Sequence, residues 1–222
     1  MAHRTILTER QRAALFALPT GEAELLQHYT LADDDLEHIR ARRRGENRLG
    51  FALQLCAFRY PGRLLAAGEA IPEPVLAFIG AQIGLTGDAL LPYATRRQTR
   101  QQHLKALRET YGYRMFSGRR ARDLRAWLDR EAEAAQSNDD LARRFVEECR
   151  RTQTILPGVS RIGRLCADAL VAAERRIEAR IADRIDEDMR ASLDALLTET
   201  VDGKASRFIW LRRFEVGPIL PT

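Results

Sequence analysis

The side chains in this sequence whose chemistry is most informative are arginines, because they are numerous and unevenly distributed. Lys and Arg together number 36 against 31 Asp and Glu, for a formal net charge of +5, and Lys105 and Lys204 are the only lysines. A guanidinium group forms planar two-pronged hydrogen bonds to phosphate and to guanine, which an ammonium group cannot do. High genomic GC content also favours arginine over lysine, so the placement of the cations is more informative than their number.

The first basic zone spans residues 40–63, where seven arginines face a single acid. A helix, a short glycine-containing turn and a second helix between Asp33 and Phe58 fit the outline of a helix-turn-helix. Ordinary helical hairpins have the same outline, so a purely structural interpretation stays open. The arginines of this zone are Arg40, Arg42, Arg43, Arg44, Arg48, Arg59 and Arg63. The candidate DNA-binding residues surround the turn and are Arg42, Arg43, Arg44, Asn47 and Arg48.

The second basic zone spans residues 96–125 and holds ten cations against two acids. Arg119 and Arg122 are three residues apart on a predicted helix, roughly opposite the apolar positions Leu124 and Leu128, so we expect them to point outward. The cations of this zone are Arg96, Arg97, Arg100, Lys105, Arg108, Arg114, Arg119, Arg120, Arg122 and Arg125. The candidate DNA-binding residues among them are Arg96, Arg97, Arg100, Lys105, Arg119, Arg120 and Arg122.

A cation in the first turn of a helix opposes the helix dipole, and a bound phosphate would reverse that penalty. We therefore expect several arginines to contact phosphates, and Arg119 and Arg122 to read base edges. The alternative is a solvated charged face. The remainder of the chain is net acidic, so the two zones could hold a polyanion at two places. The segment from Gly158 to Arg161 resembles the start of a recognition helix, although Arg161 and Arg164 also fit the solvent-exposed side of an amphipathic helix.

The elements that must position these arginines are predicted to be helices. The sequence has 45% hydrophobic and 7% aromatic residues, with few β-branched runs. The expected fold is all-α: successive small helical bundles with helix-turn-helix-like elements, followed by a long helical hairpin. The expected modules are residues 1–93, residues 94–154, which form the strongly basic module, and residues 155–222, which form a long helix, its partner helix and the start of a connector.

Helix boundaries follow from caps and breakers. Thr8 and Gln11 have the spacing of a capping box. A helix beginning at Asp33 is expected to end with Arg42, Arg43 and Arg44, to be stopped by Gly45, and to be followed by a helix that Asn47 caps. In the first module, further helices are predicted over 22–29, with an end at Tyr60, after Pro72, and around Leu90 and Leu91. In the second module, one helix is predicted to end at Gly112, one to begin after Ser117 and one to span 139–153. In the third module, a helix is predicted from Ile162 to Ile185 and another around Leu193, Leu196 and Leu197.

Other chemistry is not indicated. Asp33, Asp34 and Asp35 are consecutive and lack a calcium-loop pattern, so helix capping is the better interpretation. We expect no catalytic residue, no metal site and no cofactor in this chain, hence no enzyme activity of its own. No run of roughly 18 apolar residues is present, which argues against a membrane span and a membrane partner. We expect a cytoplasmic protein that is associated with the nucleoid through its DNA binding. The histidines, His3, His28, His38 and His103, and the cysteines, Cys56, Cys149 and Cys166, lack metal-ligand spacing.

Five segments carry a resemblance to a known family: LTERQR at 7–12, YTL at 29–31, NRLGFALQLC at 47–56, RYPGR at 59–63 and TRQQHL at 99–104. Together they resemble the N-terminal region of the Tn-three family of replicative transposases, from about Arg4 through the break at 155–158 to the C-terminus. The resemblance implies that this portion recognises terminal inverted repeats of double-stranded DNA through small helical modules. It also implies that the acidic metal-binding triad for cutting and strand transfer lies in a later ribonuclease-H-like domain.

Two alternatives stay open. The first is an interaction scaffold, in which the helix from Ile162 to Ile185 pairs with a second copy of the chain or with the C-terminal remainder of the transposase. The second is a free-standing helix-turn-helix transcriptional regulator, which would need a dimer and a palindromic operator. The chain has 222 residues, far fewer than members of the Tn-three family. We therefore expect either a fragment or a truncated relative that binds DNA ends without moving them.

Overall fold

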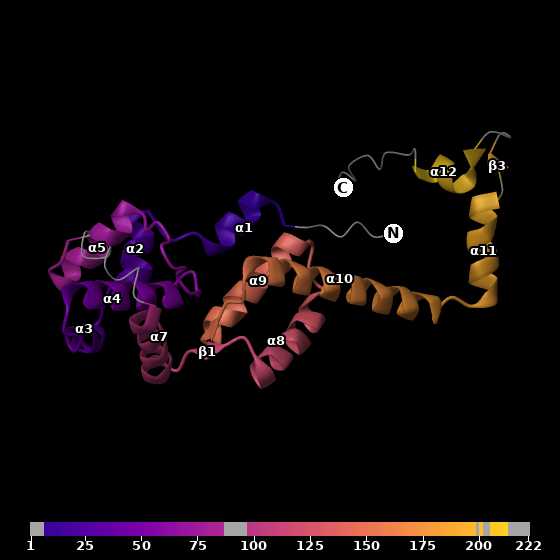
Figure 1. Cartoon of the computed structure of the whole chain (residues 1–222). Coiled ribbons are helices and arrows are strands. Elements are labelled where there is room, and N and C mark those ends of the chain that lie inside the picture. Colours follow the sequence, from indigo (N-terminus) through magenta and orange to yellow (C-terminus); the bar gives the residue numbers. More distant parts are fainter. Residues whose placement is uncertain (1–6, 87–96, 199, 202–204, 213–222) are drawn as a thin grey trace, which may run out of the picture. The chain divides into compact units, whose positions relative to one another are not determined.

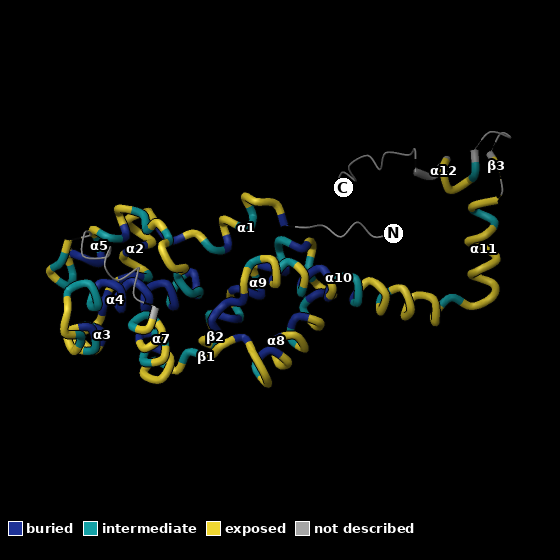
Figure 2. Tube along the Cα trace, viewed as in Figure 1, coloured by how far each residue is buried: buried dark blue, intermediate teal, exposed yellow. Residues whose placement is uncertain are grey.

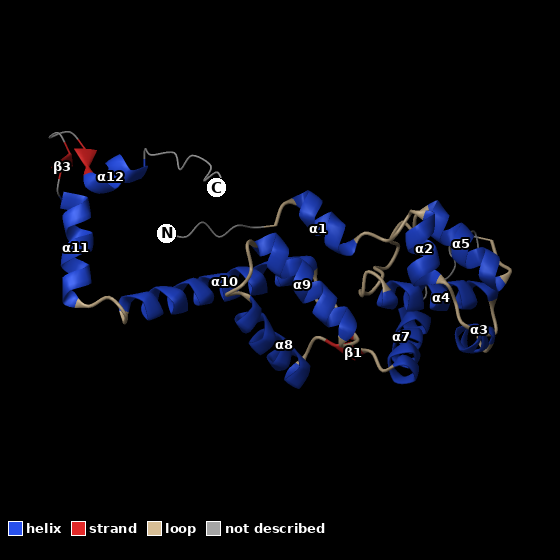
Figure 3. Cartoon of the chain, turned by 180° about the vertical axis from the view of Figure 1, so that it is seen from behind, coloured by secondary structure: helices blue, strands red, loops and turns tan. Residues whose placement is uncertain are grey.

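A computed structural model describes residues 7–86, 97–198, 200–201 and 205–212. The predicted all-α class is confirmed (Figures 1 and 3). The helices are α1 (Glu9–Phe16), α2 (Glu22–Tyr29), α3 (Asp33–Arg40), α4 (Gly45–Arg59), α5 (Glu73–Ile83), α7 (Arg97–Tyr111), α8 (Gly118–Glu131), α9 (Asn138–Arg151), α10 (Val159–Ala182), α11 (Glu187–Thr198) and α12 (Arg207–Arg212). The strands are β1 (Arg114–Met115), β2 (Thr154–Ile155), β3 (Thr200–Val201) and β4 (Ala205–Ser206).

The chain divides into two compact units, Met1–Ala173 and Glu174–Thr222. The first unit contains two clusters of buried side chains, and the second is described separately below. The predicted module boundaries at residues 93 and 154 stay predictions, and the helix expected around Leu90 and Leu91 lies outside the described residues.

Helix α4 is the centre of the first core. Every residue from Leu49 to Phe58 is buried, as Figure 2 shows along the tube of this helix. Helices α2, α3, α5 and α7 each contact α4, which covers all its sides. An α-helix that is apolar all round is stable in water only when it is enclosed in this way. This helix is therefore the buried centre of the first core.

The boundary between α3 and α4 differs from the prediction. Helix α3 ends at Arg40, so Arg42, Arg43 and Arg44 lie in the turn rather than in its last turn. Gly45 is the first residue of α4 instead of a stop signal, and Asn47 lies inside the helix instead of capping it. The reason is that Arg44 is extended and its carbonyl accepts hydrogen bonds from the amides of Asn47, at 3.1 Å, and Arg48, at 3.0 Å. Arg44 is therefore the N-cap residue.

The second core is formed by α1, α8, α9 and the first part of α10. Leu124 and Leu128 of α8 are buried in it, as predicted, together with Phe145 of α9 and Ile162 of α10. The capping box predicted at Thr8 and Gln11 is confirmed at the start of α1. Strands β1 and β2 form a short parallel pair in which Met115 lies opposite Ile155.

The segment at 60–62 connects the first core to the second. The amide of Leu156 donates a hydrogen bond to the carbonyl of Gly62 at 2.8 Å, and Arg150 Nε donates one to the carbonyl of Pro61 at 2.9 Å. The Arg150 guanidinium also lies 4.4 Å from the centre of the Tyr60 ring. Gly62 has φ of +100°, and a Cβ there would lie 3.2 Å from Arg150 Cγ, so glycine suits this close approach.

Helix α7 packs on the first core, although the sequence analysis places it in the second module. Its Leu107 is buried among the side chains of the first core, and α7 contacts α4. Leu104 and Tyr111 pack against the same core as Leu107, so the three residues share the packed face of this helix. The predicted end at Gly112, which has φ of +75°, is also confirmed.

The second unit contains α11, α12 and an antiparallel pair of β3 and β4. Helix α11 has no buried residue, and it contacts α12 and β4. Helix α10 crosses the boundary between the units. Its predicted pairing with the helix containing Leu193 stays a prediction.

Candidate nucleic-acid interface

Helix α8 presents its predicted arginines to solvent. Ala121, Leu124 and Leu128 are buried, whereas Arg119 and Arg122 are exposed, so the predicted outward direction is confirmed. The side chain of Arg119 is 89% exposed, and its contact with Asp123 is long, at 3.9 Å. An exposed ion pair of this kind contributes about 0–1 kcal/mol, so Arg119 is available to another anion.

The first turn of α8 has the features of an anion-binding helix terminus. Ser117 is the N-cap residue, but its side chain makes no capping hydrogen bond, and no acidic residue lies in the first turn. Backbone N–H groups at a helix N-terminus carry partial positive charge. With Arg119 exposed and Arg120 half-buried in the same turn, this terminus is doubly cationic and would be stabilised by a bound phosphate.

Other cations of the second zone lie on α7, β1 and α8. Arg108, Arg114, Arg122 and Arg125 are exposed, and none forms an ion pair with a carboxylate in the described part of the chain. Lys105 is exposed, and its Nζ lies 3.9 Å from Glu109. The second zone therefore keeps most of its described positive charge at the surface.

Three candidates of the second zone differ from these. Arg100 is half-buried, and its Nη2 donates a hydrogen bond to the carbonyl of Leu65 at 3.0 Å, so this side chain holds α7 against the 63–66 loop. Arg97 is the first residue of α7, but its side chain is not among those that the structure describes. Arg96 lies outside the described residues altogether.

In the first zone, Arg59 is used internally. Its Nη2 lies 2.8 Å from both carboxylate oxygens of Asp35, and the Tyr111 hydroxyl donates to Asp35 Oδ1 at 2.9 Å. The Asp35 side chain is only 3% exposed. Burial and the hydrogen bond to Asp35 raise the pKa of Tyr111. The three side chains join α3, α4 and α7, so Arg59 is a structural residue.

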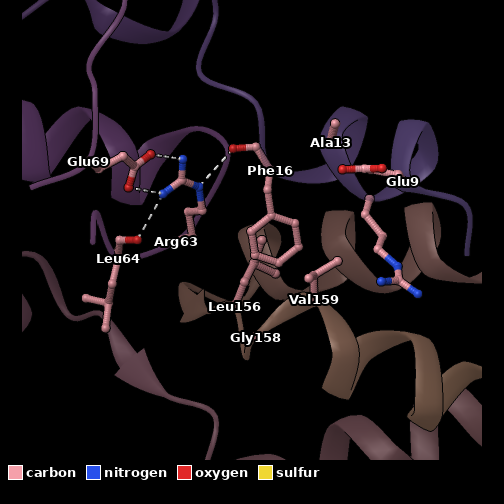
Figure 4. Close-up of a pocket in the computed structure, with 10 residues that line it drawn as sticks. Glu9, Ala13, Phe16, Arg63, Leu64, Glu69, Leu156, Gly158 and Val159 are labelled. Atoms are coloured by element: carbon pink, nitrogen blue, oxygen red, sulfur yellow. Dashed lines mark hydrogen bonds and ion pairs between the residues drawn. The ribbon is translucent and has the colours of Figure 1, made fainter. Parts of the chain in front are cut away.

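Arg63 is also used internally, beside a pocket of about 670 Å³ (Figure 4). Its guanidinium contacts both carboxylate oxygens of Glu69, and its Nε donates to the carbonyl of Phe16 at 2.8 Å. Burial alone would raise the pKa of Glu69, but hydrogen bonds from Arg63 and the Ala66 amide lower it. Because Arg63 and Glu69 neutralise each other, the pocket lacks an available cation at this end.

The turn of the first zone presents two of its candidate arginines. Arg43 and Arg44 are exposed, and Arg44 lies 3.7 Å from Glu46. Arg42 instead places its guanidinium 4.6 Å from the centre of the Phe51 ring, and Arg48 Nε donates to the carbonyl of Arg42 at 2.8 Å.

Burial limits what α4 can do. A recognition helix lies in the major groove with one face open, but α4 is buried from Leu49 to Phe58. Its first turn is the part near solvent, and there the Asn47 Oδ1 atom is buried without a hydrogen-bond partner in the described part of the chain. Any contact of this zone with DNA must therefore be made by the turn and the first residues of α4.

The described histidines take part in packing. The His28 ring stacks on Tyr60 at 4.3 Å, and the His38 ring lies edge-on to Tyr111 at 5.9 Å. His103 is buried, with its ring edge-on to Phe51 at 5.3 Å. Burial, together with the charge of nearby Arg42, lowers the pKa of His103 to about 4. No cluster of three or more potential metal ligands occurs among the described residues.

Sequence reasoning missed two features of this region. It assigned Asp35 to helix capping, and Asp35 Oδ2 does accept a hydrogen bond from the Ala32 amide at 2.8 Å, but the pairing with Arg59 could not be found because 24 residues separate them. It also gave no binding role to the glutamines of α7, Gln98, Gln101 and Gln102, which are exposed and whose three-to-four-residue spacing places them on one side of the helix.

Comparison with known proteins identifies the family. Residues 6–169 match the family described as "Domain of unknown function (DUF4158)". The chain belongs to this family. It is also 37% identical over 218 residues to the transposase for transposon Tn3926 from Escherichia coli, 35% identical over 221 residues to that for transposon Tn501 from Pseudomonas aeruginosa, and 35% identical over 218 residues to that for transposon Tn21 from Escherichia coli.

Each of these alignments covers 98% of this chain and 22% of the relative. The chain therefore spans about a fifth of the length of the curated transposases it matches. The resemblance to the Tn-three family is confirmed. Within the described residues of this DUF4158 chain, no helix combines the length and apolar character that crossing a membrane requires.

Proposed function

We propose that this chain is the N-terminal, DNA-binding part of a Tn-three family transposase and that it binds the terminal inverted repeats of its transposon. The observation that carries the proposal is the exposed cationic surface of α7, β1 and α8, whose arginines have few acidic partners among the described residues. Its relatives are transposases, so a DNA duplex is the polyanion that such a surface would meet.

In the proposed complex, most of these cations contact phosphates and supply affinity, whereas a smaller set reads bases. Arg119 and Arg122 are the proposed reading arginines, because they project from the first turns of α8. Arg43 and Arg44 contact a neighbouring stretch of the same repeat, which makes the binding bipartite. Cutting and strand transfer are proposed to belong to another part of the transposase. DNA binding by the present chain is proposed to need no cofactor.

The salt dependence of binding tests the proposal. The 222-residue chain is titrated with a duplex covering one terminal inverted repeat of its transposon, and with a scrambled duplex of the same length and composition. If roughly 6 to 10 phosphates are neutralised, affinity should fall about 10³ to 10⁵-fold between about 50 and 200 mM salt. The terminal repeat should also bind more tightly than the scrambled duplex at each salt concentration. A flat salt response, or equal affinity for both duplexes, would contradict terminal-repeat recognition.

A scaffold role for the second unit is a second candidate, and a specific observation favours it. Met189, Leu193 and Leu197 recur every four residues on α11 and are 50%, 43% and 58% exposed. Phe208 and Ile209 of α12 are also exposed, at 43% and 47%. Such apolar side chains commonly mark an interaction surface. Gel filtration of the chain, with a Leu193→Ser/Leu197→Ser variant as comparison, tests self-association. A DNA footprint tests the other half of the alternative, because a scaffold without DNA-binding activity would leave the terminal repeat unprotected.

A further inference from the structure

Helix α7 has one packed face and one solvent-exposed face, and the exposed face is rich in amides. His103 and Leu107 are buried on the packed side. The exposed residues recur with the helical period, which places them along one side of α7. These residues are Gln98, Gln101, Gln102, Lys105, Arg108 and Glu109, and we call this set the α7 stripe.

The side chains of the α7 stripe are suited to base edges rather than to phosphates alone. A glutamine amide carries both donors and an acceptor, and can bind the N6 and N7 atoms of adenine with two hydrogen bonds. Lysine and arginine bind the O6 and N7 atoms of guanine. The exposed side of α8 instead contains arginines and aspartates, and the exposed side of α3 is mainly acidic. The α7 stripe therefore combines amide and cationic groups that the exposed sides of α3 and α8 do not combine.

Four contacts hold α7 firmly against the first core. Leu107 is fully buried, Phe51 lies edge-on to His103, Tyr111 donates to Asp35, and Arg100 donates to the carbonyl of Leu65. These contacts occur along the length of the helix and fix which side faces outward. Reading base edges requires this, because side chains on a rigid element are positioned more accurately than those on a loop.

The dimensions of α7 also suit the major groove. The stripe extends over about 16 Å from Gln98 to Glu109 at 1.5 Å per residue. The major groove of B-form DNA is about 12 Å wide and accepts one α-helix. Lys105 and Arg108 add positive charge, and Glu109 is the one acid in the stripe. The stripe is thus of a size that the major groove accepts, and it has a net positive charge.

We propose that the α7 stripe enters the major groove of the terminal repeat and that Gln98, Gln101 and Gln102 determine part of its sequence specificity. This inference rests on the proposed DNA-binding function and adds a reading surface to the arginines of α8. Lys105 and Arg108 contact guanines or flanking phosphates beside the glutamines.

A glutamine-free variant tests the inference. In Gln98→Ala/Gln101→Ala/Gln102→Ala, alanine preserves the helix because it has the higher helix propensity, and no charge is removed. We expect affinity for the terminal-repeat duplex to fall at least about tenfold, because the variant loses the two-pronged contacts that distinguish the correct base from the others. Because the phosphate contacts are intact, affinity for the scrambled duplex should stay within about twofold of the wild-type value. The slope of log affinity against log salt should stay within about 10% of the wild-type slope.

The controls separate the possible outcomes. Gln27→Ala removes an exposed glutamine from α2 and should leave both affinities unchanged. Urea unfolding of each variant checks the fold, and if the triple variant is destabilised, Gln102→Ala alone is compared with Gln27→Ala. Unchanged discrimination between the two duplexes, or an equal loss for both, overturns the α7 inference while leaving DNA binding intact. Absence of salt-dependent or selective binding by the wild-type chain instead overturns the proposed function, and the α7 inference with it.

Discussion

In the first basic zone, Arg59 and Arg63 are each paired with a carboxylate of the chain, whereas in the second zone Arg122 and Arg125 are exposed with no such pair among the described residues. Both zones have a similar excess of arginine. What differs is whether the fold brings an acid from elsewhere in the sequence to the guanidinium. A local count of charge therefore overestimates the positive surface of the first zone and estimates that of the second more accurately.

The difference also separates two roles of arginine. The long side chain of Arg59 reaches Asp35 and Tyr111 and joins three helices, so its charge stabilises the first bundle. The arginines of α8 lie opposite a buried apolar stripe and contribute little to packing. Substitution of Arg59 or of its partner Asp35 should therefore change stability, and substitution of the exposed arginines of α8 should change binding.

The largest effect is expected when Asp35 is replaced by alanine. Asp35→Ala leaves Arg59 partly buried without its carboxylate and removes the acceptor of the Tyr111 hydroxyl. Removing one partner of a buried pair costs about 3–5 kcal/mol, and the 29% exposure of the Arg59 side chain places this variant near the lower value. Urea unfolding followed by circular dichroism measures the loss.

Glu109→Ala is the matched control for Asp35→Ala, because it removes the carboxylate of an exposed pair. Lys105 and Glu109 are 75% and 66% exposed, so the free energy of unfolding should change by less than about 0.5 kcal/mol. Equal losses for the two variants would mean that the pairing of Arg59 does not distinguish the first zone.

A smaller effect, on binding rather than on stability, is expected in the second zone. Each of Arg119→Ala and Arg122→Ala should weaken terminal-repeat binding by about 1–3 kcal/mol if the residue reads a base, and should reduce the salt slope by about 1 if it contacts phosphate. Their unfolding midpoints should match the wild type. Fluorescence anisotropy at several salt concentrations separates the two cases.

Arg130→Ala, at the far end of α8, is the control for these two variants because Arg130 is also exposed but lies outside the first turns. If the double variant Arg119→Ala/Arg122→Ala binds the terminal repeat as well as the wild type, α8 does not belong to the interface.

The smallest effect concerns pH and the contact between α4 and α7. His103 has a pKa of about 4 in the folded chain against an ordinary value of 6.5, so the unfolded state binds more protons between these values. The contribution of neutral, buried His103 to the free energy of unfolding is complete above about pH 6.5 and is lost as the pH falls toward 4. Between about pH 7 and pH 5.5 the loss should be roughly 1 kcal/mol.

His103→Gln removes this titrating group, so its stability should decrease less than that of the wild type over the same pH interval. Urea midpoints of both proteins at each pH give the comparison. Parallel decreases would show that other groups account for the pH dependence.

Much of the fold could be predicted from the sequence, because local rules determine the relevant features. The capping box at Thr8, the start of α5 at the prolines and the apolar face of α7 depend on residues within one or two turns of each other. The end of α3 was missed because the arginines after Arg40 have good helix propensity, and tertiary contacts, such as that of Arg42 with Phe51, determine their conformation.

The candidate interface could be predicted less completely. The outward direction of Arg119 and Arg122 follows from helix periodicity, and the structure agrees. The internal use of Arg59, Arg63 and Arg100 could not be predicted, because each partner is a carboxylate or carbonyl placed by the chain fold rather than by spacing. Periodicity gives the side of a helix on which an arginine lies, but not which distant group it meets.

The Leu156 amide and the Arg150 side chain donate hydrogen bonds to the carbonyls of Gly62 and Pro61, and these bonds bear on how the proposed DNA target is recognised. These hydrogen bonds join the first core, next to the turn at Arg43, to the second core, which includes α8. In the proposed complex, a constant spacing between that turn and the first turn of α8 would make the helical phasing of the two contacted stretches of DNA part of the specificity.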